Sequence, residues 1–333
     1  TGFKTLTTNE REAYVLITKN NAYLFTDSRY FQDSSVLDNS GVKLKLLEPG
    51  KGLIFYLQEI FNLEHIISLG YESEDLKVNE YMVMQKIFTN IQLIPLEKTI
   101  IKIREKKDLN EIEKISKACV LSDQCLKELI PFFKVGISEK EIAFKIEFWF
   151  KSHNSDIAFD PIVAVNKNSA IPHYNTKSGN GMIEESSIIL IDFGSKYQDY
   201  LSDITRMVFI NPNSEMQSVY NQLLTIQEDA MKYISLDKTP VEVDSFCRNE
   251  LQKKYLPSFS HSLGHGVGLE IHEFPKISQT SLDLVLENQV FTIEPGVYFE
   301  NKWGIRIEDT VVVQNGKAET LTKFDKKICI LDL

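Results

Sequence analysis

Carboxylates stand at the ends of strongly apolar segments in the second half of this 333-residue chain. Asp192 follows the all-aliphatic run 188–191, Glu294 follows the apolar run 290–293, and Asp203 begins the next predicted strand after Asp192. A short aliphatic run of this kind is typical of a strand that is buried on both faces. Because burying an isolated charge costs several kcal/mol, the chain must fold so that these carboxylates meet positive charge.

A fourth carboxylate lies within a predicted strand over 305–313. Strand alternation places Glu308 on the same face as Arg306, so an ion pair between these two side chains is the structural alternative to a functional role. Asp309 would point with the apolar side chains, and the sequence indicates no partner for it.

Three histidines, His261, His265 and His272, lie within twelve residues of one another in segment 259–273, which also contains three glycines. The glycines allow the backbone to fold closely around whatever the imidazoles face. A single histidine is more often structural than functional, but this clustering favours a functional site. His173 lies in the same half of the chain, also in a predicted loop.

Positive charge from the sequence itself is scarce here, because Arg206 and Arg306 are too few to neutralise four carboxylates. Two divalent metal ions would supply the four matching charges. Oxygen-rich ligands with one imidazole favour Mn²⁺ first, with Co²⁺, Fe²⁺ or Zn²⁺ as alternatives, over a cysteine-type zinc site. A single-zinc H-E-x-x-H peptidase is excluded, because His272-Glu273 lacks the second histidine.

Composition and charge restrict the kinds of molecule and the environment that this chain is suited to. The chain has 47 acidic and 37 basic side chains, a net charge of −10, which argues against nucleic acid as a partner and against a nuclease. Apolar runs are too short to span a membrane. The four cysteines form no C-x-x-C pair, so buried reduced thiols and a cytoplasmic location are expected. Because the chain starts at Thr1 without a methionine, we expect residues before it.

The periodicity of apolar residues predicts two domains. Residues 1–97 alternate short strands and helices, as in a small α/β domain, 98–110 are a basic, solvated linker with the start of a helix, and 111–333 form a second domain. The expected helices are 53–61, 79–88, 108–130, 138–152, 215–234 and 243–255. The expected strands are 13–17, 22–25, 66–69, 91–94, 188–193, 201–210, 290–294, 305–313 and 327–331.

Several ordered blocks carry a family resemblance: 171–174, 191–194, 200–206, 259–273, 291–298 and 304–310. Their series resembles the pita-bread metallopeptidase family, which includes Xaa-Pro aminopeptidase, prolidase and methionine aminopeptidase. Residues 1–3 and 25–30 are also similar to the amino domain of Xaa-Pro aminopeptidases and prolidases, a domain that the methionine-specific branch usually lacks. The resemblance implies an α+β fold, with a small α/β domain followed by a pita-bread catalytic domain at 111–333.

The resemblance also implies roles for individual residues. The implied metal ligands are Asp192, Asp203, His265, Glu294 and Glu308, with Asp203, Glu308 or both bridging two ions. The implied catalytic residues are His173, His272 and Glu294, and the implied substrate-binding residues are His261, Arg306 and Tyr298.

The expected activity is that of an Xaa-Pro aminopeptidase, a dinuclear-metal exopeptidase that hydrolyses the Xaa-Pro bond at the N-terminus of peptides. The alternative is an Xaa-Pro dipeptidase (prolidase). A non-catalytic pita-bread module that binds peptides is a third reading, but such proteins have usually lost ligands that are all present here. The resemblance further implies a proline-containing peptide substrate and a homodimer.

Overall fold

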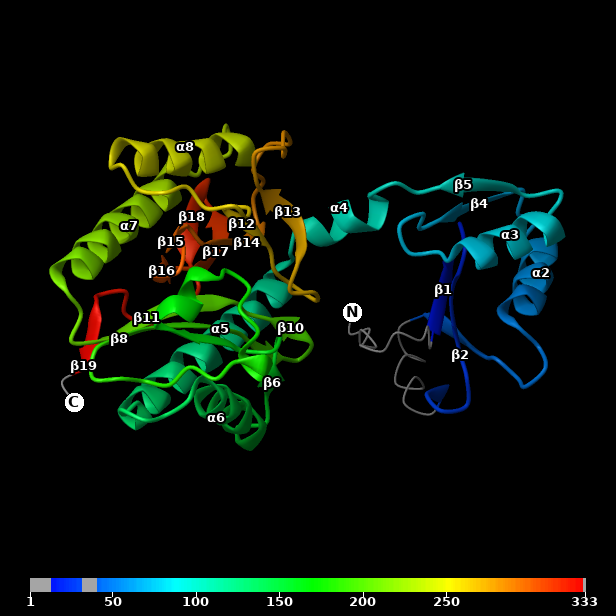
Figure 1. Cartoon of the computed structure of the whole chain (residues 1–333). Coiled ribbons are helices and arrows are strands. Elements are labelled where there is room, and N and C mark those ends of the chain that lie inside the picture. Colours follow the sequence, from blue (N-terminus) through cyan, green and yellow to red (C-terminus); the bar gives the residue numbers. More distant parts are fainter. Residues whose placement is uncertain (1–12, 32–40, 332–333) are drawn as a thin grey trace. The chain divides into compact units, whose positions relative to one another are not determined.

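The computed structural model describes residues 13–31 and 41–331. Contacts between Cα atoms divide the chain into two units, Thr1–Ile100 and Ile101–Leu333, and each unit has its own hydrophobic core (Figure 1). The block at 1–3 lies outside the described residues, whereas the block at 25–30 lies within them. Every helix within the described ranges is too short or too polar to traverse a lipid bilayer.

Over its described residues, the first unit contains two small sheets and the helices α2 and α3. In chain order its elements are β1 (Ala13–Ile17), β2 (Ala22–Thr26), β3 (Val42–Leu46), α2 (Leu53–Leu63), β4 (Ser68–Tyr71), α3 (Val78–Ile87) and β5 (Gln92–Pro95). β1 and β2 are antiparallel, whereas β2 with β3 and β4 with β5 are parallel. Leu57, Phe61 and Met84 on the helices pack with Phe25 in one core. Alternation of strands and helices is confirmed in this unit.

The second unit is built on two larger sheets. The first has the order β19-β11-β8-β7 and the second β13-β12-β14-β17-β18. The helices are α4 (Thr99–Glu105), α5 (Leu109–Leu129), α6 (Glu139–Ser152), α7 (Ser214–Tyr233) and α8 (Pro240–Lys253). The strands are β6 (Asp156–Ile157), β7 (Ile162–Val165), β8 (Ser187–Phe193), β9 (Ser195–Tyr197), β10 (Tyr200–Leu201), β11 (Ile204–Ile210), β12 (Gly264–Gly266), β13 (Glu273–Ile277), β14 (Val290–Ile293), β15 (Gly296–Phe299), β16 (Trp303–Arg306), β17 (Asp309–Gln314), β18 (Lys317–Thr320) and β19 (Cys329–Leu331).

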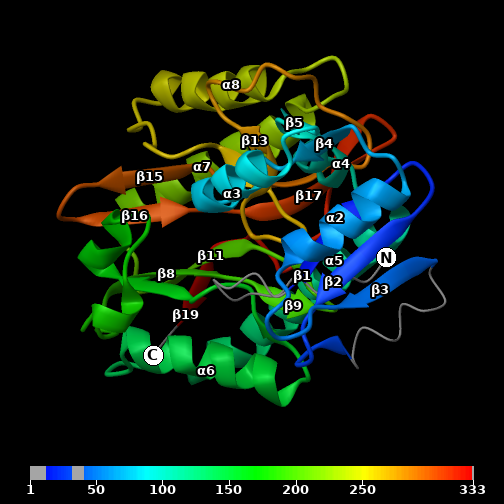
Figure 2. The ribbon, with the colours of Figure 1, turned by 90° about the vertical axis from the view of Figure 1, so that its right-hand side faces the viewer.

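Strand β8 is buried on both faces, as its aliphatic sequence predicts. Ile188 and Leu190 belong to the core that α7 and α8 share with the sheets, while Ile189 and Ile191 belong to the core beneath α5 and α6. Figure 1 shows α5 and α6 on one side of β8 and β11 and α7 and α8 on the other, and Figure 2 shows the same separation for α6 and α8. Each buried aliphatic side chain contributes about 1.5–3 kcal/mol.

Capping residues set the helix starts in the second unit. The Ser138 hydroxyl accepts a hydrogen bond from the Glu141 N–H, and the Glu141 carboxylate accepts one from the Ser138 N–H, which confirms the predicted capping box of α6. A second box formed by Thr239 and Glu242 starts α8 at Pro240, three residues before the predicted position.

Three local expectations need correction. The basic stretch forms α4, and its residues Lys102 and Lys106 are exposed as expected, but Lys107 is only 2% exposed because its ammonium binds Glu273. The strand expected over 305–313 is broken at 307–308, between β16 and β17. Cys329 is partly exposed, whereas the other three cysteines are buried free thiols.

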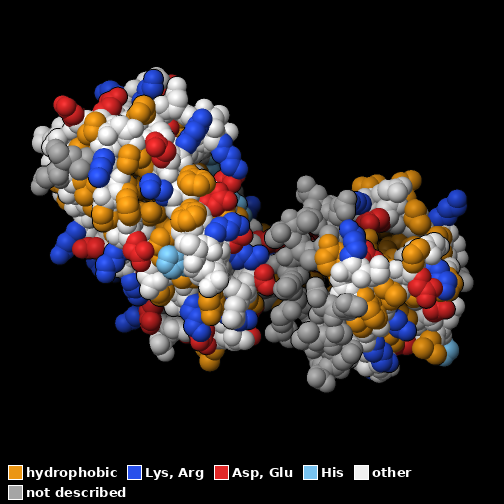
Figure 3. Space-filling view, turned by 90° about the horizontal axis from the view of Figure 1, so that it is seen from below, with side chains coloured by type: hydrophobic (Ala, Val, Ile, Leu, Met, Phe, Trp, Pro, Cys, Tyr) orange, Lys and Arg blue, Asp and Glu red, His pale blue; other side chains and the backbone are white. Residues whose placement is uncertain are grey.

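The outer face of α6 carries two exposed phenylalanines, Phe144 and Phe148, whose ring centroids lie 6.3 Å apart. Figure 3 views the second unit from the side of this helix and shows hydrophobic side chains interspersed with lysine, arginine and acidic side chains. Charged groups thus break up the apolar surface on this face.

Candidate active site and metal centre

A cavity of about 410 Å³ in the second unit gathers nine of the ten predicted site residues. These are His173, Asp192, Asp203, His261, His265, His272, Glu294, Arg306 and Glu308. Tyr298 lies behind the cavity wall, where its hydroxyl is 3.0 Å from His261 Nε2 and accepts a hydrogen bond from Arg306 Nη1. Side chains from both sheets and from the loops beside them therefore converge on one place.

Strand register explains how two of the carboxylates meet. Thr205 on β11 lies opposite Asp192 on β8, and it also forms an isolated bridge with Glu308 between β16 and β17. The Thr205 hydroxyl donates a hydrogen bond of 2.6 Å to Glu308 Oε2. Thr205 thus links the two sheets at the centre of the site, a function that its sequence context did not indicate.

Close strand packing places His265 beside its acidic neighbours. A Cβ atom on Gly264 would lie 1.8 Å from the Thr292 carbonyl oxygen, so β12 can approach β14 only with glycine at this position. His265 Nε2 is consequently 3.5 Å from Asp203 Oδ2 and 3.4 Å from Glu294 Oε1. The close approach of β12 to β14 is thus the physical reason for a glycine beside His265.

The donors in the cavity fit divalent cations. Ligand atoms of Asp203, His265 and Glu308 all lie within 4.8 Å of one another. Three buried carboxylate oxygens nearby have no hydrogen-bond partner: Asp192 Oδ1, Asp203 Oδ1 and Glu308 Oε1. Since an unpartnered buried carboxylate oxygen is costly, these atoms are suited to metal ions.

Proton affinities in the cavity agree with this interpretation. Burial and the carboxylates of Glu308 and Asp192 raise the pKa of Asp203 well above its ordinary value. Burial and Asp192 raise the pKa of Glu308 to about 8. Burial and the neighbouring His272 lower the pKa of His265 to about 3, so its imidazole is neutral and can offer a lone pair. In the absence of cations, ionisation of all these carboxylates at once is therefore unfavourable.

Arg306 is buried and largely occupied by protein partners. Its Nε donates to the Thr205 hydroxyl, its Nη1 to the Pro172 carbonyl oxygen and the Tyr298 hydroxyl, and its Nη2 to Asp192. The expected alternative, an ion pair with Glu308, is wrong, because the guanidinium pairs with Asp192 instead. Four of its five N–H groups are used, so no two remain free for a bidentate clamp on a substrate carboxylate.

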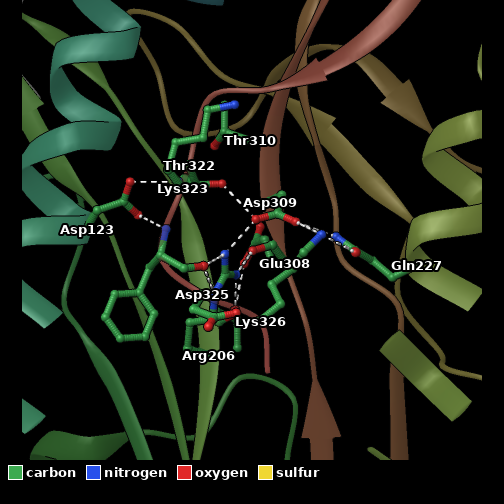
Figure 4. Close-up of polar contacts among 12 residues, drawn as sticks. Asp123, Arg206, Gln227, Glu308, Asp309, Thr310, Thr322, Lys323, Asp325 and Lys326 are labelled. Atoms are coloured by element: carbon green, nitrogen blue, oxygen red, sulfur yellow. Dashed lines mark hydrogen bonds and ion pairs between the residues drawn. The ribbon is translucent and has the colours of Figure 1, made fainter. Parts of the chain in front are cut away.

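A buried charge network lies directly behind Glu308 (Figure 4). Arg206 donates hydrogen bonds to the Glu308 carbonyl oxygen and to Asp309 Oδ1, and Lys326 and Gln227 donate to Asp309 Oδ2. Burial would raise the pKa of Asp309, but Arg206 and Lys326 hold it well below its usual range. These donors are the partners of Asp309 that the sequence did not indicate.

Other residues line the cavity that sequence reasoning did not single out. They are Phe159, Ile162, Ser262, Ile271, Glu273 and Lys276. Ser262, Ile271 and Glu273 belong to the 259–273 segment, next to His261 or His272, but were not assigned a role. Phe159, Ile162 and Lys276 belong to no clustered motif, so no local signal could have identified them. Among the described residues, no carboxylate pairs with Lys276, which leaves a cation in the wall.

Comparison with known proteins is consistent with this geometry. The model of metallopeptidase family M24 matches residues 113–315. An Xaa-Pro dipeptidase of Pyrococcus horikoshii is 33% identical over 330 residues, 95% of this chain and 88% of the relative. The crystal structure of an X-Pro aminopeptidase from Thermotoga maritima has a TM-score of 0.87 at 34% identity, with 96% of this chain and 90% of that chain covered. An Xaa-Pro dipeptidase structure from Bacillus anthracis has a TM-score of 0.90 at 30% identity, with 97% and 90% covered.

The fold and the site define a metallopeptidase with an α+β architecture. The chain belongs to metallopeptidase family M24. The resemblance to the pita-bread peptidases and the expected fold class are thereby confirmed, and membership of the family implies that the chain binds divalent metal.

Metal binding should stabilise the protein measurably. At an ion concentration of about 100 times Kd, binding to the native state alone adds about 2.7 kcal/mol, which corresponds to a Tm increase of roughly 5 °C. We expect MnCl₂ to raise the Tm of EDTA-treated protein by this amount and to leave the Tm of Asp203→Ala almost unchanged. Asp229→Asn, on the exposed face of α7, is the matched control and should respond like the wild type. Equal shifts in all three proteins would contradict the placement of the metal site.

Proposed function

We propose that the chain is an Xaa-Pro aminopeptidase, a dinuclear-metal exopeptidase that hydrolyses the bond before proline at the N-terminus of peptides. The observation that carries the proposal is the convergence of four carboxylates and His265 on one cavity, with three buried oxygens that have no protein partner. Relatives named X-Pro aminopeptidase and Xaa-Pro dipeptidase support the choice of bond. Mn²⁺ is the proposed ion, on the basis of the oxygen-rich donor set.

The proposed ligands are the set that the family resemblance implies: Asp192, Asp203, His265, Glu294 and Glu308. When bound there, two divalent ions would polarise the scissile carbonyl and lower the pKa of the attacking water.

Glu294 is the proposed general base. In the metal-free protein, burial and the carboxylates of Glu308 and Asp192 raise its pKa above the ordinary value. A carboxylate placed beside the attacking water can accept its proton as a general base. The Thr292 hydroxyl, which donates to Glu294 Oε1 at 3.3 Å, orients the carboxylate. In this proposal Glu294 removes a proton from the attacking water and passes it to the leaving nitrogen.

His173 and His272 are the proposed hydrogen-bond donors to the developing oxyanion or to the leaving nitrogen. Both line the cavity with the carboxylates, and the rings of His272 and His265 are in edge contact, with centroids 4.4 Å apart. A preorganised donor of this kind lowers the barrier by about 3–4 kcal/mol. His261 is proposed to contact the substrate at the wall nearer Tyr298.

Two features bear on the length of the substrate. Because the guanidinium of Arg306 is occupied within the protein, it does not offer a fork for the free carboxylate of a dipeptide, which favours longer peptides and the aminopeptidase. Lys276 supplies a single positive charge in the wall and supports an Xaa-Pro dipeptidase as the second candidate, as do the relatives of that name. A non-catalytic module is disfavoured because no proposed ligand is missing.

Initial rates on matched peptides test the proposal. We expect Mn²⁺-loaded enzyme to cleave Ala-Pro-Ala at least about tenfold faster than Ala-Ala-Ala, because differential contacts with the substrate are worth about that factor or more. EDTA should abolish the activity and Mn²⁺ should restore it. A higher kcat/KM for Ala-Pro than for Ala-Pro-Ala would favour the dipeptidase, and metal-independent activity or no preference for proline would contradict the proposal.

We also propose that the protein is a homodimer. The proposal rests on the family resemblance, and light scattering during gel filtration would test it. A mass of 38.3 kDa, that of one chain, would contradict it.

A further inference from the structure

Glu139, at the start of α6, is fully buried and serves as a hydrogen-bond acceptor for one segment of chain. Its Oε1 accepts from the Val165 N–H at 2.7 Å and from Asn168 Nδ2 at 2.8 Å. Its Oε2 accepts from the Tyr174 hydroxyl and from the Gly181 N–H, each at 2.9 Å. Among the described residues, no cation forms an ion pair with it.

The space around this carboxylate is filled. A Cβ atom on Gly181 would lie 2.4 Å from Glu139 Oε1, and one on Gly179 would lie 2.1 Å from the Tyr174 hydroxyl oxygen. The first turn of a helix favours a negative charge, which helps the carboxylate to remain buried without a cation. Glu139 is therefore held in one geometry by its surroundings.

All four donors lie in residues 165–181, the segment that carries His173. His173 itself is exposed and makes no hydrogen bond to the described residues. Its two chain neighbours are both held: the Tyr174 hydroxyl binds Glu139, and the Pro172 carbonyl oxygen accepts from Arg306 Nη1 at 3.0 Å. The backbone of His173 is thus fixed on both sides while its imidazole is left free for a ligand.

We infer that Glu139 is a positioning residue that sets the place of the His173 imidazole in the cavity by holding the 165–181 segment. The inference rests on the function proposed above, in which His173 donates a hydrogen bond in the transition state. Glu139 touches neither the metal donors nor the cavity, so it acts only through the segment. A purely structural role would instead lower stability without any specific link to His173.

A double-mutant cycle separates these roles. We expect His173→Ala to lower kcat by about 10²-fold to 10³-fold, as for other preorganised donors. Glu139→Gln places an amide NH₂ group against one backbone N–H and one side-chain donor. We expect it to lower kcat by about tenfold or more while the Kd for Mn²⁺ stays within about threefold of the wild type. The double variant should lose no more than His173→Ala alone, because groups acting as a unit are non-additive.

Two further variants provide a second test of the segment and a control for the helix. Tyr174→Phe removes one of the four hydrogen bonds and should show a smaller loss with the same non-additivity, even if Glu139→Gln folds poorly. Glu147→Gln, on the exposed face of the same helix, is the matched control and should behave as the wild type. Losses that multiply in the double variant would overturn the inference, as would a loss in Glu139→Gln when His173→Ala has full activity.

A spectroscopic measurement keeps the inference independent of the substrate assignment. The imidazole ¹⁵N resonance of His173, assigned by its absence from His173→Ala, should shift or broaden in Glu139→Gln and in Tyr174→Phe but not in Glu147→Gln. An unchanged resonance in both variants would overturn the inference even if the wild type cleaves prolyl peptides. A wild type that is inactive on those peptides but shows the expected shifts would contradict the proposed function alone.

Discussion

Glu294→Gln is expected to lower kcat for cleavage before proline by about 10³-fold or more while most of the metal remains bound. The amide retains one oxygen for a metal ion but cannot accept a proton from water, and general base catalysis is typically worth about 10²-fold to 10⁴-fold. The substitution also removes one negative charge from a cavity where burial and Glu308 already raise the pKa of Glu294. Stability should therefore not fall.

The measurement is kcat on Ala-Pro-Ala together with the metal content of the same sample by atomic emission. Glu113→Gln is the matched control, since this exposed side chain only pairs with Lys117 one turn away on α5. The control should keep both values within about twofold of the wild type, because exposed pairs of this kind contribute little. Full activity in Glu294→Gln with metal present would remove Glu294 from the role of base.

Local sequence signals predicted the framework of the second unit well. The aliphatic run before Asp192 became β8, buried on both faces, and the Ser138 and Glu141 pair became the cap of α6. Both features depend on residues that are adjacent or one helical turn apart, so the physics is contained in a short window. The alternating sequence of β3 carries a similar signal, but no strand was predicted there.

Signals that depend on distant partners could not be read from the sequence. Lys107 is basic and follows a polar stretch, yet it is buried because Glu273, 166 residues later, lies against it. Arg306 could pair with the nearby Glu308 on alternation alone, but the break between β16 and β17 and the position of β8 bring Asp192 to it instead. Choosing between such partners requires the tertiary arrangement.

The candidate site shows the same division. Clustering of acidic residues and histidines pointed to the carboxylates and imidazoles of the cavity, because most of them stand at the end of an apolar run or beside glycines, but it did not identify the remaining lining residues. Thr205, at the centre of the site, and Glu139, outside the cavity, have ordinary settings in a strand and at a helix start. Their importance arises only from contacts across 103 residues in one case and 26 to 42 residues in the other.

Asp309→Asn is expected to destabilise the protein by about 3–5 kcal/mol, the usual cost of removing one partner from a buried ion pair. The change leaves the buried guanidinium of Arg206 and the ammonium of Lys326 without their counter-charge. Because Arg206 also holds the Glu308 carbonyl oxygen, some of the loss should be accompanied by weaker metal binding. Urea unfolding of EDTA-treated protein measures the first effect, and Mn²⁺ titration measures the second.

Asp229→Asn, which removes an exposed pair with Lys232, is the matched control and should leave the free energy of unfolding almost unchanged. The effect of Asp309→Asn should also depend on pH in a defined direction. Since Arg206 and Lys326 hold the pKa of Asp309 below its ordinary value, its contribution is fully present above about pH 4 and is lost as the pH falls through the lower, folded-state pKa. The stability difference between wild type and variant should therefore shrink only in strong acid. A loss no larger than that of the control at neutral pH would show that the network behind Glu308 does not require this charge.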